Sequence, residues 1–361
     1  MVESEKRNRD RDSIVVVVNR YPPVTSPYRY SEDVMKTFEG HAVQINLLFG
    51  QDGWDREHAG EDFKPRIRFS NILNHFVMNA NFRDAVMFIK SLSKKYPHVM
   101  VHYTNQFSGV FQGIGDLMIV SVHDSPYDQS AGGRMQRYYT HWLYGRLSAE
   151  QHIIAQTDSL AVELKDFGFM GRIDVIPLSY SSVFRPLSAD KKALRERLGL
   201  PIDRKLVLSI SSSDKRKNIS GVKKAMDSLG EDFRLVRVGI PIGSSITFRN
   251  IADEKLNEIY NACNVLLFPS LYEGFGLPIV EAFASGLPVV TSRIPTIEEV
   301  ASDAAVLVNP MDNAEVVEGV KSAIENSDSL RISGLNRAKN FTYERFRQRL
   351  TEYYRELKVL T

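Results

Sequence analysis

The sequence lacks the features that would place it among secreted or membrane-spanning proteins. Cys263 is the only cysteine among 361 residues, so no internal disulfide can form, which fits a reducing compartment. No apolar run approaches the roughly 20 residues that a membrane-spanning helix needs. No apolar signal region follows the polar residues at the N-terminus. These absences predict a cytoplasmic protein and leave open only peripheral contact with the inner membrane surface.

An excess of charge of one sign is also lacking. The 46 Lys and Arg residues nearly balance the 44 Asp and Glu residues, so the net charge is +2 and nucleic acid is not predicted as a partner. Hydrophobic residues make up 43% and charged residues 25%, as in ordinary soluble domains. Because single cores stop growing at about 250–300 residues, a chain of this length is expected to form two domains.

Short apolar runs alternate with segments of helical spacing, which predicts an α/β fold with parallel sheets covered by helices on both faces. The predicted strands are residues 14–18, 43–49, 99–103, 117–122, 153–156, 174–177, 206–210, 233–238, 265–268 and 289–292. The predicted helices are residues 31–39, 82–96, 253–261, 278–285 and 342–357, with a further short helix around residues 298–299. Segments 19–30, 51–65 and 247–251 are expected to be loops.

A glycine-containing loop connects one of these strands to a helix. The strand Val265–Phe268 is apolar throughout, and Pro269 ends it. Gly274 and Gly276 are expected to make the loop tight, because glycine adopts backbone angles that other residues avoid. Pro278 suits the start of a helix, since its missing N–H would have no partner there. A strand, a tight loop and a helix N-terminus together predict an anion site.

Two carboxylates, Glu273 and Glu281, flank this loop. The N–H groups of residues 274–277 are expected to point out of the loop, where the helix dipole adds positive potential. Carboxylates repel phosphate but accept hydrogen bonds from sugar hydroxyls. Phosphate between two hydroxyl-bearing rings describes a nucleotide sugar. An ordinary strand–loop–helix with solvated glutamates is the alternative for two carboxylates taken alone.

The string Glu273-Gly-Phe-Gly-Leu-Pro-Ile-Val-Glu281 closely resembles the signature of the family-four retaining glycosyltransferases, which have the GT-B architecture. The resemblance implies two doubly wound, Rossmann-like domains that face a central cleft. It implies transfer of a hexose, with retention of configuration, from a nucleoside diphosphate sugar to a hydroxyl of a glycan, a lipid-linked acceptor or a small molecule. The implied reaction requires no cofactor and no metal ion.

The resemblance also assigns roles to single residues. His123 and Asp124 resemble a family pair that follows a central strand, in which the histidine lies near the reacting sugar, so His123 and Glu273 are the expected catalytic residues. Lys217 occupies the place of the lysine that binds the donor diphosphate, and Glu281 is expected to bind the ribose hydroxyls. The predicted donor-binding residues are Ser211, Arg216, Lys217, Ile251, Gly274, Phe275, Gly276, Leu277 and Glu281.

Three positions depart from the family pattern. Many relatives carry a glycine pair in the loop after the first strand, but here that loop has no glycine, so Ser26 or Arg29 is expected to contact the donor unless the loop only shapes the acceptor side. Ser211 stands where the family often has a further arginine, six residues before Lys217. Asn264 stands where an aspartate is more usual.

The resemblance divides the chain into three parts. Residues 1–183 are expected to form the acceptor-side domain and residues 190–340 the nucleotide-sugar domain, with a boundary between Tyr180 and Asp190. Residues 341–361 are expected to form a helix that crosses back toward the first domain.

Other functions fit the sequence less well. A catalytically silent sugar-nucleotide-binding or scaffold protein of the same fold is the alternative that the three departures favour. A nicotinamide dehydrogenase needs a third glycine after Gly113 and Gly115, where Met118 stands instead. The signature loop disfavours a sugar-phosphate epimerase of similar architecture. Asp10 and Asp12 form an Asp-x-Asp, but they lie in a polar terminal segment where solvated charges are expected.

Overall fold

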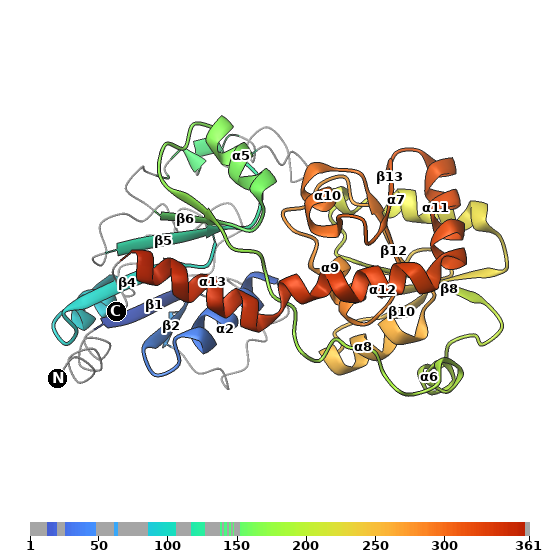
Figure 1. The fold of residues 1–361 in the computed structure, drawn as a ribbon, viewed down its shortest axis with the longest axis horizontal. Coiled ribbons are helices and arrows are strands. Elements are labelled where there is room, and N and C mark those ends of the chain that lie inside the picture. Colours follow the sequence, from blue (N-terminus) through green and yellow to red (C-terminus); the bar gives the residue numbers. More distant parts are fainter. Residues whose placement is uncertain are drawn as a thin grey trace.

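The structure is a computed structural model, and it describes residues 13–19, 26–47, 61–63, 86–105, 117–126, 138, 141–142, 144–145, 147 and 152–357. Two parallel sheets lie one beside the other along the length of the molecule, and helices pack around each of them (Figure 1). The predicted α/β architecture of two Rossmann-like domains is therefore confirmed. Asp10, Asp12, Gly113 and Gly115 lie outside the described residues.

The N-terminal sheet has seven strands in the order β3-β2-β1-β4-β5-β6-β7. Its strands are β1 (Ser13–Asn19), β2 (Ala42–Leu47), β3 (Glu61–Phe63), β4 (His98–Tyr103), β5 (Leu117–Val122), β6 (His152–Ala155) and β7 (Ile173–Val175). β1 is buried along its whole length, as four consecutive valines at the centre of a parallel sheet require. The order of strands reverses its direction between β1 and β4.

The C-terminal sheet has six strands in the order β10-β9-β8-β11-β12-β13. They are β8 (Lys205–Ser211), β9 (Phe233–Gly239), β10 (Ile246–Phe248), β11 (Val265–Phe268), β12 (Val289–Ser292) and β13 (Val306–Val308). Here the order reverses between β8 and β11. In doubly wound sheets, ligands bind beyond the carboxyl ends of the strands at such a reversal. The loops after β8 and β11 therefore form the expected binding edge.

Helices of both domains bury their apolar faces against these sheets. Those around the N-terminal sheet are α2 (Ser26–Thr37), α5 (Asp158–Asp166) and α13 (Tyr343–Glu356). Those around the C-terminal sheet are α6 (Lys191–Leu198), α7 (Ile219–Leu229), α8 (Asp253–Ala262), α9 (Leu277–Ala284), α10 (Pro295–Ala301), α11 (Asn313–Glu325) and α12 (Ser327–Ala338). Short 3-10 helices, η2 (Lys215–Lys217) and η3 (Lys339–Phe341), complete the description.

The last helix of the chain, α13, returns to the N-terminal sheet and packs against α2 (Figure 1). Phe346, Leu350 and Tyr354 lie on one of its faces and are buried in the same cluster as Val15 and Val17 of β1. The chain therefore passes between the two sheets twice, once between β7 and α6 and once at η3.

Three segments differ from the sequence predictions. α2 begins at Ser26 and not near Ser31, because Pro27 is tolerated in the first turn, where its missing N–H would have no helical partner. β3 lies within segment 51–65, and β10 includes the start of segment 247–251, although both segments were expected to be loops. Both strands are three residues long and lie at a sheet edge, so they show no clear alternation of apolar and polar residues.

Gly274, in the loop before α9, lies directly against the N-terminal domain. A Cβ atom at this position would be 1.7 Å from the carbonyl oxygen of His123. Its φ angle is outside the left-handed region, so close approach, and not an unusual backbone conformation, makes glycine necessary here. Gly276 differs in this respect, since its φ of 91° is left-handed.

Glu299 of α10 connects the domains at another point. Its carboxylate accepts hydrogen bonds from the backbone N–H groups of Asp158 at 2.8 Å and Ser159 at 2.9 Å, and from the Ser159 hydroxyl at 3.0 Å. These N–H groups belong to the first turn of α5, where helical partners are lacking and the dipole favours a negative charge. A side chain of one domain thus caps a helix of the other.

Substitution of Gly274 by alanine is expected to keep the domains apart. The added methyl group collides with the backbone of His123, which cannot rotate away as a flexible side chain could. Small-angle scattering should show a larger radius of gyration for Gly274→Ala than for the wild type. The matched control is Gly319→Ala, whose Cβ would be 2.7 Å from Val308 within the same domain. It should lower the melting temperature without expanding the molecule. An unchanged radius for Gly274→Ala contradicts this role.

Candidate active site

The predicted anion loop joins β11 to α9 at the binding edge of the C-terminal sheet. Gly276 is the residue before the helix, and Pro278 stands in its first turn. Phe275 and Leu277 are buried and pack with the apolar cluster of the N-terminal domain, where the ring of Phe275 meets that of Phe341 at 5.6 Å. These two side chains therefore anchor the loop. Only their backbone groups are available for the predicted contact with a donor.

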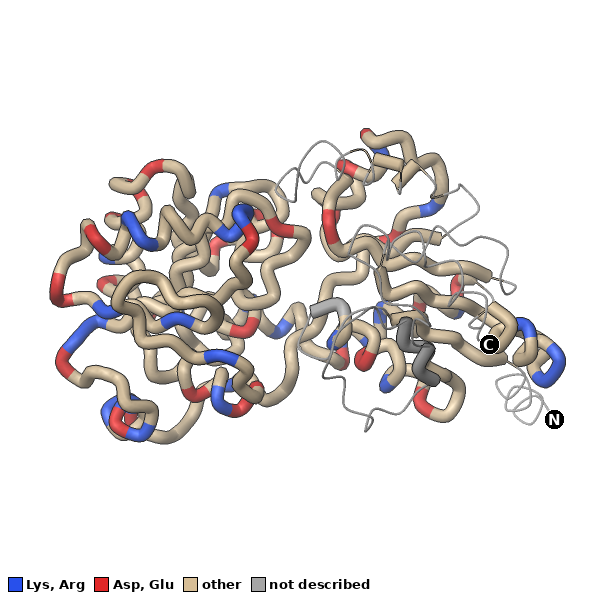
Figure 2. Tube along the Cα trace, turned by 180° about the vertical axis from the view of Figure 1, so that it is seen from behind, with Lys and Arg blue, Asp and Glu red and all other residues tan. Residues whose placement is uncertain are grey.

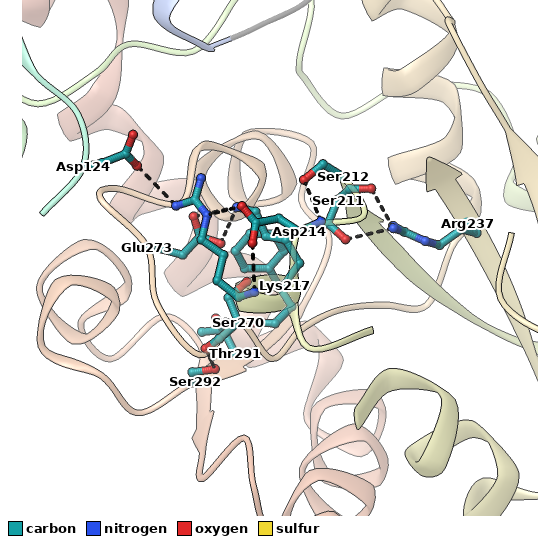
Figure 3. Close-up of polar contacts among 12 residues, drawn as sticks. Asp124, Ser211, Ser212, Asp214, Lys217, Arg237, Ser270, Glu273, Thr291 and Ser292 are labelled. Carbon is teal, nitrogen blue, oxygen red and sulfur yellow. Dashed lines mark hydrogen bonds and ion pairs between the residues drawn. The ribbon is translucent and has the colours of Figure 1, made fainter. Parts of the chain in front are cut away.

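Lys217 and Glu273 form an ion pair between the loop after β8 and the loop after β11 (Figure 3). The Lys217 Nζ atom is 2.7 Å from Oε1 and 2.8 Å from Oε2 of the carboxylate. Glu273 is only 5% exposed, and the Lys217 ammonium also lies 5.5 Å from the ring centre of Phe268. The structure thus brings the residue predicted for phosphate and the residue predicted for the sugar into direct contact.

Arg216 extends toward the N-terminal domain. Its guanidinium lies 3.2 Å from a carboxylate oxygen of Asp124, which follows β5 in that domain. Asp214 holds the same guanidinium at 3.2 Å and also caps the backbone N–H of Arg216. Arg216 is therefore a contact between the domains as well as a candidate ligand for phosphate.

His123 is half-buried and neutral. Its Nε2 atom lies 2.8 Å from the carbonyl oxygen of Thr104, so Nε2 carries the proton and Nδ1 carries the lone pair. Burial lowers the pKa of His123 to about 4, although Asp124 and the Thr104 carbonyl act in the opposite direction. The ring packs edge-on against Tyr30 at 5.1 Å. A neutral imidazole with a fixed tautomer can accept a hydrogen bond from a hydroxyl group.

Both carboxylate oxygens of Glu281 accept hydrogen bonds from protein groups. Arg29 of α2 donates to Oε1 at 2.7 Å, and the Tyr260 hydroxyl donates to Oε2 at 2.8 Å. Arg29 also contacts the Asp253 carboxylate at 2.5 Å. Burial raises the pKa of Glu281 to about 7, while Arg29 and Tyr260 favour its ionised form. Arg29, for which a contact with the donor is predicted, is bound to two carboxylates of the C-terminal domain, one of them the predicted ribose ligand Glu281.

Two further predicted residues lie at the same edge. Ser211 ends β8, and both its carbonyl oxygen and its hydroxyl accept hydrogen bonds from Arg237. Ile251 is half-buried and packs against the core just before α8 begins. Ser270, in the loop after β11, is buried, and its hydroxyl has no hydrogen-bond partner in the described part of the chain. That hydroxyl is available to a ligand of the loop.

Asn264 lies away from this edge. It precedes β11, so it stands at the amino end of the sheet, where its side-chain oxygen accepts from the Leu206 N–H and from Arg195, each at 2.7 Å. The replacement of the usual aspartate therefore concerns the packing of β11 and α6. It does not concern the chemistry at the carboxyl ends.

A hollow lined by described residues also lies away from the site. It has a volume of about 970 Å³ and is lined by residues near the amino ends of β8 and β9, among them Arg204, Phe233 and Arg234. None of the predicted site residues lines it. Ligands of doubly wound sheets bind at the opposite ends of the strands, so this hollow is not the candidate active site.

Sequence reasoning missed the roles of Tyr260 and Arg237. Tyr260 lies in a string that resembles the family, but only the fold shows that its hydroxyl reaches Glu281. Arg237 follows an apolar stretch of β9, where the pattern signals a strand and gives no sign of a charged group at a site.

Within the described ranges, no helix combines the length and the apolar character needed to cross a bilayer. The same residues contain no group of three or more His, Cys, Asp or Glu side chains placed to hold a metal ion. Positive and negative residues are interspersed along the described chain (Figure 2).

Comparisons with known proteins agree with this geometry. Residues 190–343 match the family model for glycosyl transferases group 1. Over 160 residues the chain is 31% identical to the O-antigen chain mannosyltransferase B of Escherichia coli, and the match covers 38% of this chain and 42% of that protein. The chain thus spans less than half the length of this curated relative.

Solved structures resemble the whole fold. The sucrose-phosphate synthase of Thermosynechococcus elongatus has a TM-score of 0.80 at 20% identity, over 97% of this chain and 100% of that one. HepE of Anabaena, in complex with UDP and glucose, has a TM-score of 0.74 at 16% identity, over 95% and 99%. At these identities the similarity establishes the fold alone. The fold is therefore the GT-B architecture, and residues 190–343 are similar to the glycosyl transferases group 1.

Proposed function

We propose that the protein is a retaining glycosyltransferase that moves a hexose from a nucleoside diphosphate sugar to a hydroxyl of a glycan, a lipid-linked acceptor or a small molecule. The ion pair between Lys217 and Glu273 carries this proposal, because it spans the reversal point between β8 and β11. A cation for phosphate and a carboxylate for hydroxyl groups then stand side by side at the edge where such sheets bind ligands.

Each charged group has a role in this reaction. Lys217 and the N–H groups of the loop bind the diphosphate and stabilise the charge that develops as it leaves. Glu273 accepts hydrogen bonds from the hydroxyls of the transferred sugar. Glu281 accepts from the ribose hydroxyls, which replace the Arg29 donor on Oε1. The neutral His123 helps to position the donor or the acceptor.

The transfer itself follows a front-face substitution. The acceptor oxygen forms a bond to the anomeric carbon while the bond from that carbon to the diphosphate oxygen breaks. The acceptor proton passes to the leaving diphosphate, so the configuration is retained without a covalent intermediate. Glu273 is bound to Lys217 and serves as a hydrogen-bond acceptor rather than as a nucleophile. Closure of the domains around the site excludes water and limits hydrolysis of the donor.

The named relatives indicate the substrate classes. HepE was solved with UDP and glucose, which supports a nucleotide sugar as the donor. The E. coli relative is a mannosyltransferase of the O-antigen chain, which supports a glycan acceptor. We propose that the reaction needs no metal ion or cofactor and takes place in the cytoplasm, with contact to the inner membrane surface where the acceptor is lipid-linked.

A silent sugar-nucleotide-binding protein is the second candidate. The absence of arginine at Ser211 and the binding of Arg29 to carboxylates favour it. Incubation with a panel of nucleotide sugars separates the two functions. Release of nucleoside diphosphate, faster with an acceptor present, supports transfer, whereas binding without any turnover supports the silent protein.

Glu273→Gln should reduce the rate of transfer while preserving nucleotide binding. The amide keeps the size of the side chain but is a weaker hydrogen-bond acceptor than the carboxylate. The weaker hydrogen bonds to the sugar hydroxyls should therefore destabilise the transition state. Turnover is expected to fall by about ten- to a thousandfold. The free nucleoside diphosphate should bind at least as tightly, because Lys217 loses its carboxylate partner. The control is Glu298→Gln on the exposed face of α10. Normal turnover at saturating donor rules out this role for Glu273.

Donor binding should strengthen as the pH rises through 7. Burial raises the pKa of Glu281 to about 7, and only the ionised carboxylate accepts both ribose hydroxyls. Calorimetric titration with the nucleoside diphosphate should show affinity rising by up to about tenfold between pH 6 and pH 8. In Glu281→Gln, the only remaining dependence of affinity on pH should be the one caused by titration of the nucleotide's own phosphate. In Lys217→Ala, the pH dependence caused by Glu281 should remain. Equal slopes in the wild type and Glu281→Gln speak against the ribose role.

A further inference from the structure

Arg237 is a fully buried arginine whose hydrogen bonds all go to neutral oxygens. It lies in β9 and is 0% exposed. Its Nε donates to the carbonyl of Ile240 at 3.2 Å, Nη1 to those of Ser209 and Val238 at 3.0 Å each, and Nη2 to the carbonyl and hydroxyl of Ser211 at 2.6 and 2.8 Å. No carboxylate of the described residues lies within ion-pair distance of it, so its positive charge has no counter-ion there.

A buried charge without a partner is costly, and proteins rarely keep one without a reason. Burial lowers the pKa of Arg237 to about 10, so the side chain stays protonated at neutral pH. The carbonyl oxygens around it offset part of the cost through their dipoles. They do not cancel the charge, which therefore contributes positive potential to its surroundings.

The position of this charge is informative. In the register of β8 and β9, Ser209 lies opposite Arg237, and the long side chain extends from there to the carboxyl end of β8. Figure 3 shows it directed at Ser211, at the start of the segment that carries Lys217. Gly239 makes room for this arrangement, since a Cβ there would be 2.3 Å from the Ser211 carbonyl and 3.1 Å from Nη2 of Arg237.

Ser211 is the position at which the related signature often has an arginine. We propose that Arg237 supplies from the neighbouring strand the positive charge that position 211 lacks, and so strengthens diphosphate binding through space. Because every N–H of the guanidinium is already used, Arg237 acts by Coulomb attraction and not as a direct ligand. The inference rests on the proposed function, since it assumes that a diphosphate binds at this edge.

The competing explanation is that Arg237 only ties backbone carbonyls together. The chain offers a matched control for it in Arg195, which is also buried. Arg195 donates to the carbonyls of Ala262 at 2.9 Å and Arg204 at 3.2 Å and to the Asn264 side chain at 2.7 Å, again without a carboxylate. Its contacts lie at the amino end of the sheet, away from the proposed site.

The experiment compares Arg237→Met with Arg195→Met by calorimetric titration with UDP, GDP and ADP, after circular dichroism and melting curves have verified folding. Both variants should melt at lower temperature than the wild type. Arg237→Met should weaken binding of the diphosphate by about tenfold, as loss of one charge near an anion in a partly screened site predicts. Arg195→Met should leave binding unchanged. Adding Ser211→Arg to Arg237→Met should restore affinity.

Arg237→Lys separates charge from hydrogen bonding and serves if Arg237→Met does not fold. Lysine keeps the charge but cannot make the five hydrogen bonds, so the affinity should stay near that of the wild type. The inference is overturned if Arg237→Lys folds but loses about tenfold in affinity, as predicted for Arg237→Met. It is also overturned if Arg237→Met binds the diphosphate as tightly as Arg195→Met does. If the wild type binds none of the three nucleotides, the proposed function fails. If Lys217→Ala weakens binding and Arg237→Met does not, only the role of Arg237 fails.

Discussion

The pairing of buried charges at the carboxyl edge of the C-terminal sheet is the interaction on which the site depends. Glu273 and Glu281 are both nearly inaccessible to water, and a buried carboxylate stays ionised only when cations or hydrogen-bond donors surround it. Lys217 pairs with Glu273, and Arg29 and Tyr260 donate hydrogen bonds to Glu281. In the proposed reaction a nucleotide sugar uses these same groups, so the donor binds by exchanging partners with them rather than by burying new charge.

The partner of Glu281 comes from the other domain, and this couples the site to the contact between the domains. Arg29 reaches from α2 to Glu281, Arg216 reaches back to Asp124, and Glu299 caps α5. Gly274 allows the loop itself to touch the backbone of His123. Ligand binding that draws Arg29 away from Glu281 therefore weakens one contact between domains while the others persist. In the proposed reaction, closure and donor binding are linked through this shared carboxylate.

The sequence predicts the local parts of this arrangement well. The strand Val265–Phe268, the loop with Gly276 and the helix that follows depend on neighbours in the chain, and the structure has them where the pattern places them. Contacts between strands that are adjacent in space but distant in sequence were not predictable in the same way. Arg237 reaches Ser211 only because β9 lies beside β8, and Arg29 reaches Glu281 only because two domains meet. The start of α2 was missed because three prolines suggested a loop.

The departures from the family pattern have different consequences because they lie at opposite ends of the same sheet. At the amino end, Asn264 replaces an aspartate but keeps an oxygen for Arg195 and for the N–H of Leu206, so the hydrogen bonds remain and only a charge is lost from a structural contact. At the carboxyl end, Ser211 stands in place of an arginine beside the predicted diphosphate, where charge itself matters. Arg237 lies next to Ser211 and donates a hydrogen bond to it. At position 264 the missing charge belongs to a packing contact, and no other charge among the described residues replaces it. At position 211 the missing charge belongs to the predicted binding edge, and Arg237 lies next to it. This difference favours an active enzyme over a silent relative.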